Sequence, residues 1–247
     1  MRNIQLTLQY DGSRYKGWQG QKDNDLTVQG KLQAVLEKMT EEPIELIGAE
    51  RTDIGVHAEN YIANFKTNCA LSTAFMEDYM NDFLPDDIVI KEVEEVEERF
   101  HARYNVKSKT YRYTIDTNPY RNVFNRKYTY HMDEALDLKV MKEVAEILKG
   151  KHDFQGFTSM KAGTKSTRRE VEDILIIQEG SLIKINIRAN DFLWHMPRFM
   201  VGVLLEVGKG KMNRDAVKQL LNGNNKCEGA LLAQSKALCL EHVMYEK

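Results

Sequence analysis

Short strand-like segments are interleaved with amphipathic helical segments along this 247-residue chain, and this order limits the folds that it can adopt. Residues 3–10 alternate polar and apolar side chains, which is typical of a strand with one buried face. Residues 28–39 carry apolar side chains at helical spacing and follow Thr27, a residue type that favours the start of a helix. The regular βα alternation of a doubly wound parallel sheet is missing. The order therefore predicts an α+β fold, with a mostly antiparallel central sheet flanked by helices on one side.

The later half of the chain repeats this order approximately. Two extended segments, 100–106 and 110–115, precede a helix that ends at Gly150, after which strand-like alternation returns. The other elements are expected as strands at 44–47, 61–65, 88–90, 171–177, 182–187 and 238–243, and as helices from Ser72 or Thr73 and over 198–207 and 215–221. No linker or low-complexity segment separates the halves. We therefore expect two pseudo-repeated halves, residues 1–104 and 105–247.

The charge balance and the cysteine content exclude several classes of protein. Lys and Arg number 35 against 37 Asp and Glu, a formal net charge of -2, so the chain is not uniformly basic, although a local basic face is possible. Three cysteines are too few and too scattered for a disulfide framework. No apolar run reaches transmembrane length, and the first residues lead directly into a strand rather than a signal sequence. We expect a reduced, cytoplasmic, globular protein with no membrane partner.

Positive charge and aromatic side chains are concentrated in one stretch, residues 99–127. It holds eight Lys and Arg residues against one acid, Asp116, whereas residues 92–98 before it hold five glutamates. A second basic cluster, 161–169, lies in a segment rich in Gly, Ser and Thr that is typical of an exposed loop. Basic side chains mixed with aromatic rings suit a surface that neutralises phosphates and stacks unpaired bases. A solvated strand face with a few buried tyrosines would have the same composition.

The motifs of cofactor and metal chemistry are missing from the sequence. Residues 208–210 lack the third glycine of a dinucleotide-binding loop, and residues 163–166 resemble a phosphate-binding loop only superficially. Cys239 and His242 form one possible ligand pair, but no second pair stands at zinc spacing. The sequence therefore predicts a mechanism with no cofactor and no metal.

The loop 50–58 concentrates reactive side chains between two predicted strands. It places a guanidinium at Arg51, a carboxylate at Asp53 and an imidazole at His57 around a glycine. A nearby cation stabilises an ionised carboxylate, and reactive groups tend to lie on loops of a rigid scaffold. Asp53 is therefore a candidate catalytic carboxylate. The same residues also suit a plain turn that Asp53 caps and in which Arg51 pairs with it.

A series of motifs resembles, in the same order, those of the tRNA pseudouridine synthase A (TruA) family, over essentially the whole chain. The motifs are Tyr10-Asp11-Gly12-Ser13-Arg14-Tyr15-Lys16-Gly17-Trp18-Gln19, Arg51-Thr52-Asp53-x-Gly55-Val56-His57-Ala58, Leu84-Pro85-x-Asp87-Ile88, Phe100-His101-Ala102-Arg103, Tyr111-x-Tyr113, Lys151-His152-Asp153-Phe154 and Arg198-x-Met200-Val201-Gly202. One such motif is weakly specific, whereas the ordered series is highly specific. The chain is therefore similar to this family as a whole.

The resemblance implies an isomerase that converts uridine in tRNA to pseudouridine, with the pseudouridine synthase fold and no cofactor. Asp53 would be the essential carboxylate, acting either as a nucleophile or by removing a ribose proton. Tyr111 would stack on the target uracil and assist the loss of its C5 proton. Arg198 would pair with Asp53 and keep it ionised in a pocket that excludes water.

The resemblance also implies how the RNA is held. The target uridine would lie on the 3′ side of the anticodon stem-loop, at tRNA positions 38 to 40, and would have to leave the helix at a cost of a few kcal/mol. Arg51 would fill the space that the base vacates. The family is homodimeric, with the RNA spanning both subunits. The residues expected to contact RNA are Arg51, Arg14, His57, Arg103, Lys107, Lys109, Arg168 and Arg169.

Four positions depart from the family pattern. They are Glu50 in place of glycine, Ile54 in place of alanine, Pro197 in place of an aliphatic residue, and Ala237 in place of the glycine of a Gly-Leu pair. Because Asp53, Tyr111 and Arg198 are all present, we expect the chemistry to be retained. The departures leave open a different target, either another tRNA position or ribosomal RNA. A non-catalytic RNA-binding module is the alternative from a different functional class.

Overall fold

The computed structural model describes residues 1–21, 26–161, 163, 166–223 and 226–246 and divides the chain into two compact units. Unit 1 comprises residues 1–107 and 239–247, and unit 2 comprises residues 108–238. These units differ from the expected halves chiefly in the last strand, which belongs to unit 1. That strand pairs with residues 57 and 58, far away in the sequence, and alternation within a strand does not reveal its partner.

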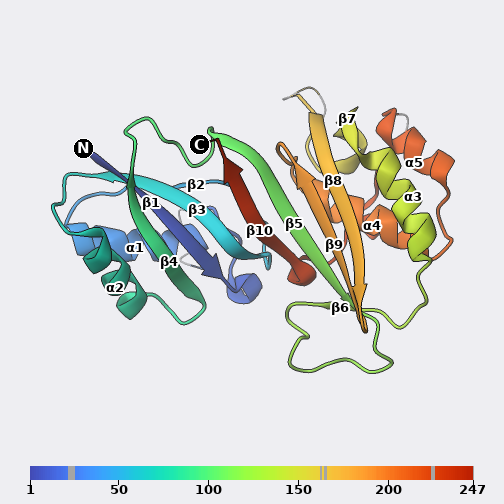
Figure 1. Ribbon diagram of the computed structural model, residues 1–247, viewed down its shortest axis with the longest axis horizontal. Coiled ribbons are helices and arrows are strands. Elements are labelled where there is room, and N and C mark those ends of the chain that lie inside the picture. The colour runs from blue at the N-terminus through green and yellow to red at the C-terminus, as the bar shows by residue number, and fades with distance from the viewer. Residues whose placement is uncertain (22–25, 162, 164–165, 224–225, 247) are drawn as a thin grey trace. The chain divides into compact units, whose positions relative to one another are not determined.

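The sheet of unit 1 has the strand order β4-β1-β3-β10, with a short strand β2 also paired to β3 (Figure 1). Its strands are β1 (Arg2–Tyr10), β2 (Ile47–Gly48), β3 (His57–Thr67), β4 (Ile88–Val96) and β10 (Leu238–Tyr245). Strands β1, β2 and β4 run antiparallel to their neighbours, whereas β10 runs parallel to β3. Alternation along β1 directs Ile4, Leu6 and Leu8 into the core, where all three are fully buried.

The helices of unit 1 are α1 (Val28–Thr40) and α2 (Thr73–Phe83). Each begins at the capping residue that its sequence indicates: the Thr27 side chain accepts a hydrogen bond from the N–H of Gly30, and the Ser72 side chain accepts one from Phe75. Helix α2 packs against β4 and against α1 (Figure 1). The apolar stripes of both helices are thereby removed from water, which stabilises the unit.

The sheet of unit 2 is antiparallel along the order β5-β9-β8-β7, and β6 adds a short parallel pair to β5. The strands are β5 (Val106–Asp116), β6 (Tyr130–His131), β7 (Gly150–Asp153), β8 (Arg168–Glu179) and β9 (Leu182–Ala189). The helices are α3 (Leu138–Leu148), α4 (Met196–Gly208) and α5 (Arg214–Leu221). Helix α3 packs on β8, α4 and α5, and α4 is buried along almost its whole length.

The predicted α+β class with mostly antiparallel strands is confirmed, but two expected strands are wrong. The strand at 44–47 is reduced to the two residues of β2. The extended segment expected at 100–106 is a turn that precedes β5. There, the side chain of Asn105 accepts a hydrogen bond from the N–H of His101, so the backbone finds a local partner instead of a neighbouring strand. The described residues also form short 3₁₀ turns at Gly12–Arg14, Phe154–Phe157, Gly229–Leu231 and Ser235–Ala237.

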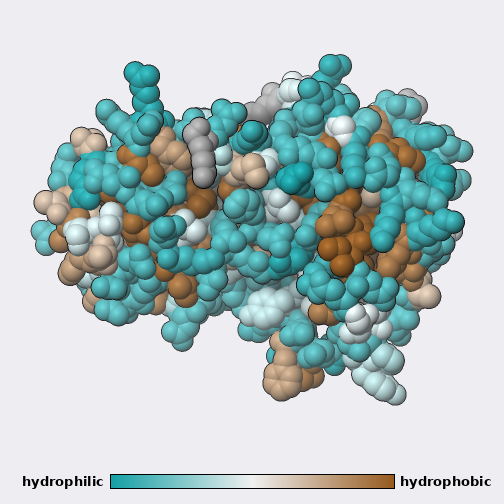
Figure 2. Space-filling model, in the orientation of Figure 1, coloured by the Kyte–Doolittle hydropathy of each residue, from teal (hydrophilic) through white to brown (hydrophobic). Residues whose placement is uncertain are grey.

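Hydrophilic side chains cover most of the face shown in Figure 2, and a hydrophobic area lies over β8 and β9. Within the described residues, none of the helices combines the length and the apolar character that crossing a bilayer requires.

Candidate functional site

The loop before β3 places Asp53 at the first position of a tight turn. The N–H of Val56 donates to the carbonyl of Asp53 over 3.1 Å, and Gly55 has a φ of 76°. A positive φ at the third residue of a four-residue turn is the conformation that favours glycine. Asp53 itself is half-buried, whereas Ile54 after it is exposed. The turn therefore fixes the backbone that carries the candidate carboxylate.

The opening motif packs directly against this loop. The N–H of Trp18 donates to the carbonyl of Thr52 over 3.2 Å, and the hydroxyls of Tyr10 and Thr52 are hydrogen-bonded over 2.8 Å. Gly12 lies so close to the loop that an added Cβ would be 2.0 Å from the carbonyl oxygen of Val56. The two strongest sequence motifs of unit 1 thus form one packed structure around Asp53.

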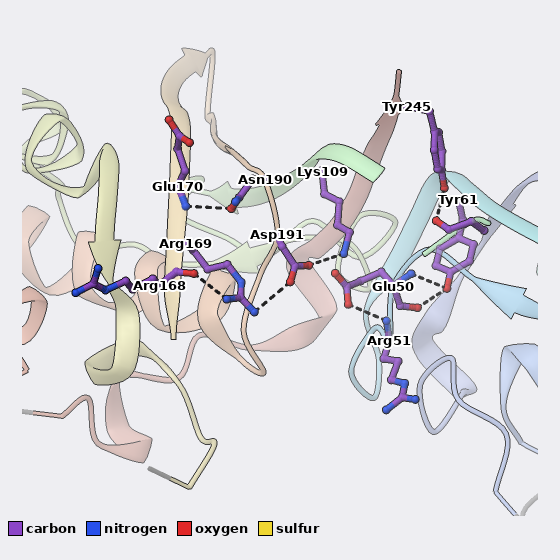
Figure 3. A network of polar contacts seen from close by, with 11 residues as sticks. Glu50, Arg51, Tyr61, Lys109, Arg168, Arg169, Glu170, Asn190, Asp191 and Tyr245 are labelled. Atoms are coloured by element: carbon purple, nitrogen blue, oxygen red, sulfur yellow. Dashed lines mark hydrogen bonds and ion pairs between the residues drawn. The ribbon is translucent and has the colours of Figure 1, made fainter. Parts of the chain in front are cut away.

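A stacked aromatic pair supports the start of the loop 50–58. Trp18 and Tyr61 are both buried, and their rings stack with centroids 4.0 Å apart. The Tyr61 hydroxyl donates to the carbonyl of Glu50 and accepts from the N–H of Glu50 over 3.2 Å (Figure 3). Burial raises the pKa of Tyr61 well above its ordinary value, so the phenol keeps its proton and its role as a donor.

The departure at Glu50 has a local structural role. Its side-chain Oε1 accepts a hydrogen bond from the N–H of Arg51 over 2.9 Å. The Arg51 side chain extends away from these backbone contacts in Figure 3 and is exposed. A carboxylate at position 50 therefore ties the backbone on which Arg51 projects outward.

In unit 2, Tyr111 lies on β5 opposite Ile187 of β9. Its side chain is buried and meets the Phe192 ring edge-on, with centroids 5.2 Å apart and an interplanar angle of 81°. This T-shaped contact fixes the orientation of the tyrosine ring.

Arg198 lies in the first turn of α4, directly after Pro197, in agreement with the expected helix start. Its Nε donates to the carbonyl of Ala233 over 2.7 Å, and the N–H of Ala233 donates back to the carbonyl of Arg198 over 3.3 Å. Burial raises the pKa of Tyr113, and the positive charge of Arg198 partly opposes this rise. The reciprocal bonds hold the guanidinium stem in one position.

The residues expected to contact RNA divide into three groups by exposure. The exposed ones are Arg14, Arg51, Lys107 and Arg168, the half-buried ones are Arg103 and Arg169, and the buried ones are His57 and Lys109. Arg14 forms an ion pair with Asp87, so its charge is partly compensated. Exposed guanidinium and ammonium groups are the ones that can approach phosphates without a desolvation cost.

His57 does not lie at the surface, contrary to the expectation of an RNA contact. Only 6% of the residue is exposed, and its Nδ1 accepts a hydrogen bond from the N–H of Gly12 over 3.0 Å. Asp11 Oδ1 lies 3.2 Å from the same nitrogen. The imidazole therefore connects the opening motif to the start of β3, which is a structural role.

Lys109 is also buried, contrary to the same expectation, with 4% of the residue exposed. Its Nζ contacts Asp191 Oδ1 over 2.7 Å, and Arg169 Nη2 contacts Asp191 Oδ2 over 3.1 Å (Figure 3). One carboxylate thus holds both cations in unit 2. A buried charge needs such a partner, so Lys109 serves the packing of β5 rather than an exposed phosphate site.

The described part of the chain holds no group of three or more His, Cys, Asp or Glu residues arranged to bind a metal ion. The residues that sequence reasoning missed are ones that contact other side chains of the site, not reactive groups. Asp191 carries no motif that indicates its ion pairs, and in the sequence Tyr104 is only one aromatic residue of a basic stretch.

Comparisons with known proteins agree with this arrangement of motifs. A family model described as tRNA pseudouridine synthase matches residues 7–105 and 144–246. The chain is 49% identical over 245 residues to tRNA pseudouridine synthase A 1 of Clostridium tetani, and 44% identical over 245 residues to tRNA pseudouridine synthase A 2 of Bacillus anthracis. Each alignment covers 99% of this chain and 100% of the relative.

A more distant relative and a solved structure match as well. The chain is 40% identical to tRNA pseudouridine synthase A of Acetivibrio thermocellus, again over 99% of this chain and 100% of the relative. A chain from the crystal structure of a Cbf5-Nop10-Gar1 complex aligns with a TM-score of 0.32 and 12% identity, covering 81% of this chain and 54% of that chain, a likeness too weak to bear on function. The family model and the whole-length relatives are sufficient: the chain belongs to the tRNA pseudouridine synthase family.

Proposed function

We propose that this isomerase converts uridine to pseudouridine in the anticodon stem-loop of tRNA, at positions 38 to 40, and that Asp53 is its essential carboxylate. The observation that carries the proposal is the construction of the Asp53 loop. A tight turn and the opening motif hold its backbone on both sides, and the side chain is half-buried. A reactive group held by packed neighbours costs little reorganisation when the substrate binds.

The reaction is an internal rearrangement. The bond between uracil N1 and ribose C1′ breaks, the base turns, and C5 forms a new bond to C1′. The proton on C5 leaves and N1 takes up a proton, so the nucleotide gains and loses no atoms overall. Two roles suit Asp53: its carboxylate attacks as a nucleophile, or it removes a ribose proton.

Tyr111 and Arg198 take supporting roles in the proposal. The Tyr111 ring, oriented by Phe192, stacks on the target uracil and assists the loss of the C5 proton. Arg198, held through its Nε by the carbonyl of Ala233, supplies the positive charge that keeps the catalytic carboxylate ionised. Both roles rest on the resemblance to the family and on the fixed placement of each side chain within unit 2.

RNA binding in the proposal uses the exposed basic side chains together with the half-buried Arg103. Arg51 occupies the space that the extruded base leaves, and phosphate contacts from Arg14, Arg103, Lys107 and Arg168 offset the cost of extrusion, a few kcal/mol. Because the substrate is tRNA, the proposal places the enzyme in the cytoplasm.

The test of the proposed function is the release of tritium from transcripts labelled with 5-³H-uridine, because the new bond at C5 displaces the label. An anticodon stem-loop transcript should release tritium, and transcripts with that uridine replaced by cytidine should release none. Release only from transcripts of other tRNA regions or of ribosomal RNA would show that the modified uridine lies there and not in the anticodon stem-loop. Failure to release tritium from every transcript, together with tight RNA binding, would instead support the non-catalytic module.

Tyr111→Phe is expected to bind the RNA as the wild type does and to turn over about 10²- to 10⁴-fold more slowly, the usual range for losing a proton-transfer group. The ring and its contact with Phe192 are retained, so the base can still stack. Single-turnover tritium release and filter binding measure the two effects separately. An unchanged turnover rate would remove the hydroxyl from the mechanism.

The homodimer implied by the resemblance is also a prediction. Light scattering at micromolar protein concentration should give a mass of twice 28.6 kDa. A monomer mass at that concentration would contradict it.

A further inference from the structure

A small pocket in unit 1 lies beside the candidate loop, and its aromatic residues have no role in the mechanism above. Its volume is about 210 Å³, and its lining includes Gly48, Arg51, His101, Arg103 and Tyr104. Pockets for drug-sized ligands are larger, about 300–1,000 Å³. A cavity of this size suits one flat ring rather than a whole cofactor.

The rim of this pocket carries a preassembled aromatic platform. The rings of Tyr104 and His101 lie with centroids 4.1 Å apart and an interplanar angle of 32°. The Tyr104 ring contacts His101, yet 76% of the residue is exposed, so much of the ring is open to solvent. An exposed tyrosine that already packs against a second ring on one side offers its other surface to a base at low entropic cost.

The turn that precedes β5 holds the His101 ring in place through hydrogen bonds. Its Nδ1 accepts hydrogen bonds from the N–H groups of Arg103 over 3.1 Å and Tyr104 over 3.3 Å. The backbone N–H of His101 donates to the side chain of Asn105 over 2.6 Å. Since Nδ1 acts as an acceptor, the ring is neutral and carries its proton on Nε2. Burial, and then the charge of Arg103, lower the pKa of His101, which keeps the ring in this state.

The surroundings favour a nucleotide over an apolar partner. Two guanidinium groups, of Arg51 and Arg103, line the same pocket, and Glu45 is the single acid among its lining residues. Arginine beside an aromatic ring is the combination that binds a phosphate while a base stacks. The pocket also lies near the chemistry: Arg51 and Asp53 are two residues apart, a span of at most about 7 Å along the backbone.

We propose that the Tyr104–His101 platform and its pocket bind one unpaired nucleotide of the RNA substrate, next to the target uridine, with the base stacked on Tyr104 and its phosphate at Arg103. This inference rests on the proposed function, because it takes the RNA to be the substrate acted on at Asp53. Stacking is tolerant of base identity, so the platform holds the RNA in register without selecting its sequence.

The experiment compares Tyr104→Ala with the wild type on an anticodon stem-loop transcript. The variant should raise both the Kd for the RNA and KM about 5- to 100-fold, the effect of losing one base–aromatic stack, and leave kcat at saturating RNA unchanged. Tyr104→Trp should restore both values. Phe75→Ala, which removes another exposed aromatic residue of the same unit, is the matched control and should change neither.

A second arm identifies the stacked nucleotide. Transcripts with an abasic site at each position flanking the target should reduce wild-type affinity at one position, and the difference between wild type and Tyr104→Ala should disappear for that transcript alone. Equal Kd and KM for wild type and Tyr104→Ala, or a loss confined to kcat, would overturn the inference. Binding by fluorescence anisotropy requires no turnover, so an inactive wild type would refute the proposed function while the binding comparison still decides this one.

Discussion

Asp53→Asn is expected to reduce pseudouridine formation by about 10³-fold or more, the size of effect seen when a group central to the chemistry is removed. The amide has nearly the same shape as the carboxylate but neither attacks as a nucleophile nor accepts a proton. The turn is retained, because its hydrogen bond uses the backbone carbonyl of residue 53. Tritium release under single-turnover conditions measures the loss, and circular dichroism and RNA binding should match the wild type.

The matched control for this change is Asp86→Asn, at an exposed aspartate of a loop in the same unit. It makes the same change of charge and shape and should leave the rate unaffected. A rate for Asp53→Asn close to that of Asp86→Asn would show that the carboxylate of Asp53 has no essential part in the reaction.

Gly12→Ala is expected to lower both the stability of the protein and the rate of the reaction. The added Cβ would lie 2.0 Å from the carbonyl oxygen of Val56, a backbone atom that cannot rotate away as a side chain can. Relief requires the opening motif and the Asp53 loop to move apart. Overpacking of this kind lowers the free energy of unfolding by about 1–3 kcal/mol or more. Urea denaturation measures the loss, and tritium release should show a slower turnover at temperatures where the variant is still folded.

Gly229→Ala serves as the control for this prediction. A Cβ at that position meets no atom within 4 Å, and its φ is not in the left-handed region, so stability and rate should stay close to those of the wild type. If Gly12→Ala and Gly229→Ala unfolded at the same urea concentration, the close approach of the two motifs would not matter to the fold.

Local patterns in the sequence predict the elements with strong periodicity. The helix after Thr27 and the helix after Ser72 begin at those residues because a side-chain oxygen satisfies a backbone N–H within the same few residues. The strand predicted at 100–106 is wrong because the side chains of His101 and Asn105 accept hydrogen bonds from backbone N–H groups of the same segment. These local bonds stabilise a turn instead of a strand. Capping by such residues is as local as a strand pattern, and spacing alone does not decide between them.

The candidate site shows the same division. The composition of the Asp53 loop indicates chemistry, but only the resemblance to a known family distinguishes a catalytic carboxylate from a turn residue. His57 and Lys109 are among the residues that the resemblance to the family implies as RNA contacts. Both are buried because each has found a partner that is distant in sequence, Gly12 for His57 and Asp191 for Lys109.

The sequence by itself determined the α+β class, the starts of the main helices, the alternation of the core strands and membership of a family, because these depend on periodicity, capping and ordered motifs. The tertiary structure alone decided that the last strand pairs with β3, that Gly12 contacts the Asp53 loop, and that the exposed ring of Tyr104 packs against His101. The physical reason is that such contacts depend on how side chains fill space between distant segments. Burial of a charge or a ring follows from that packing and from no pattern within a single segment.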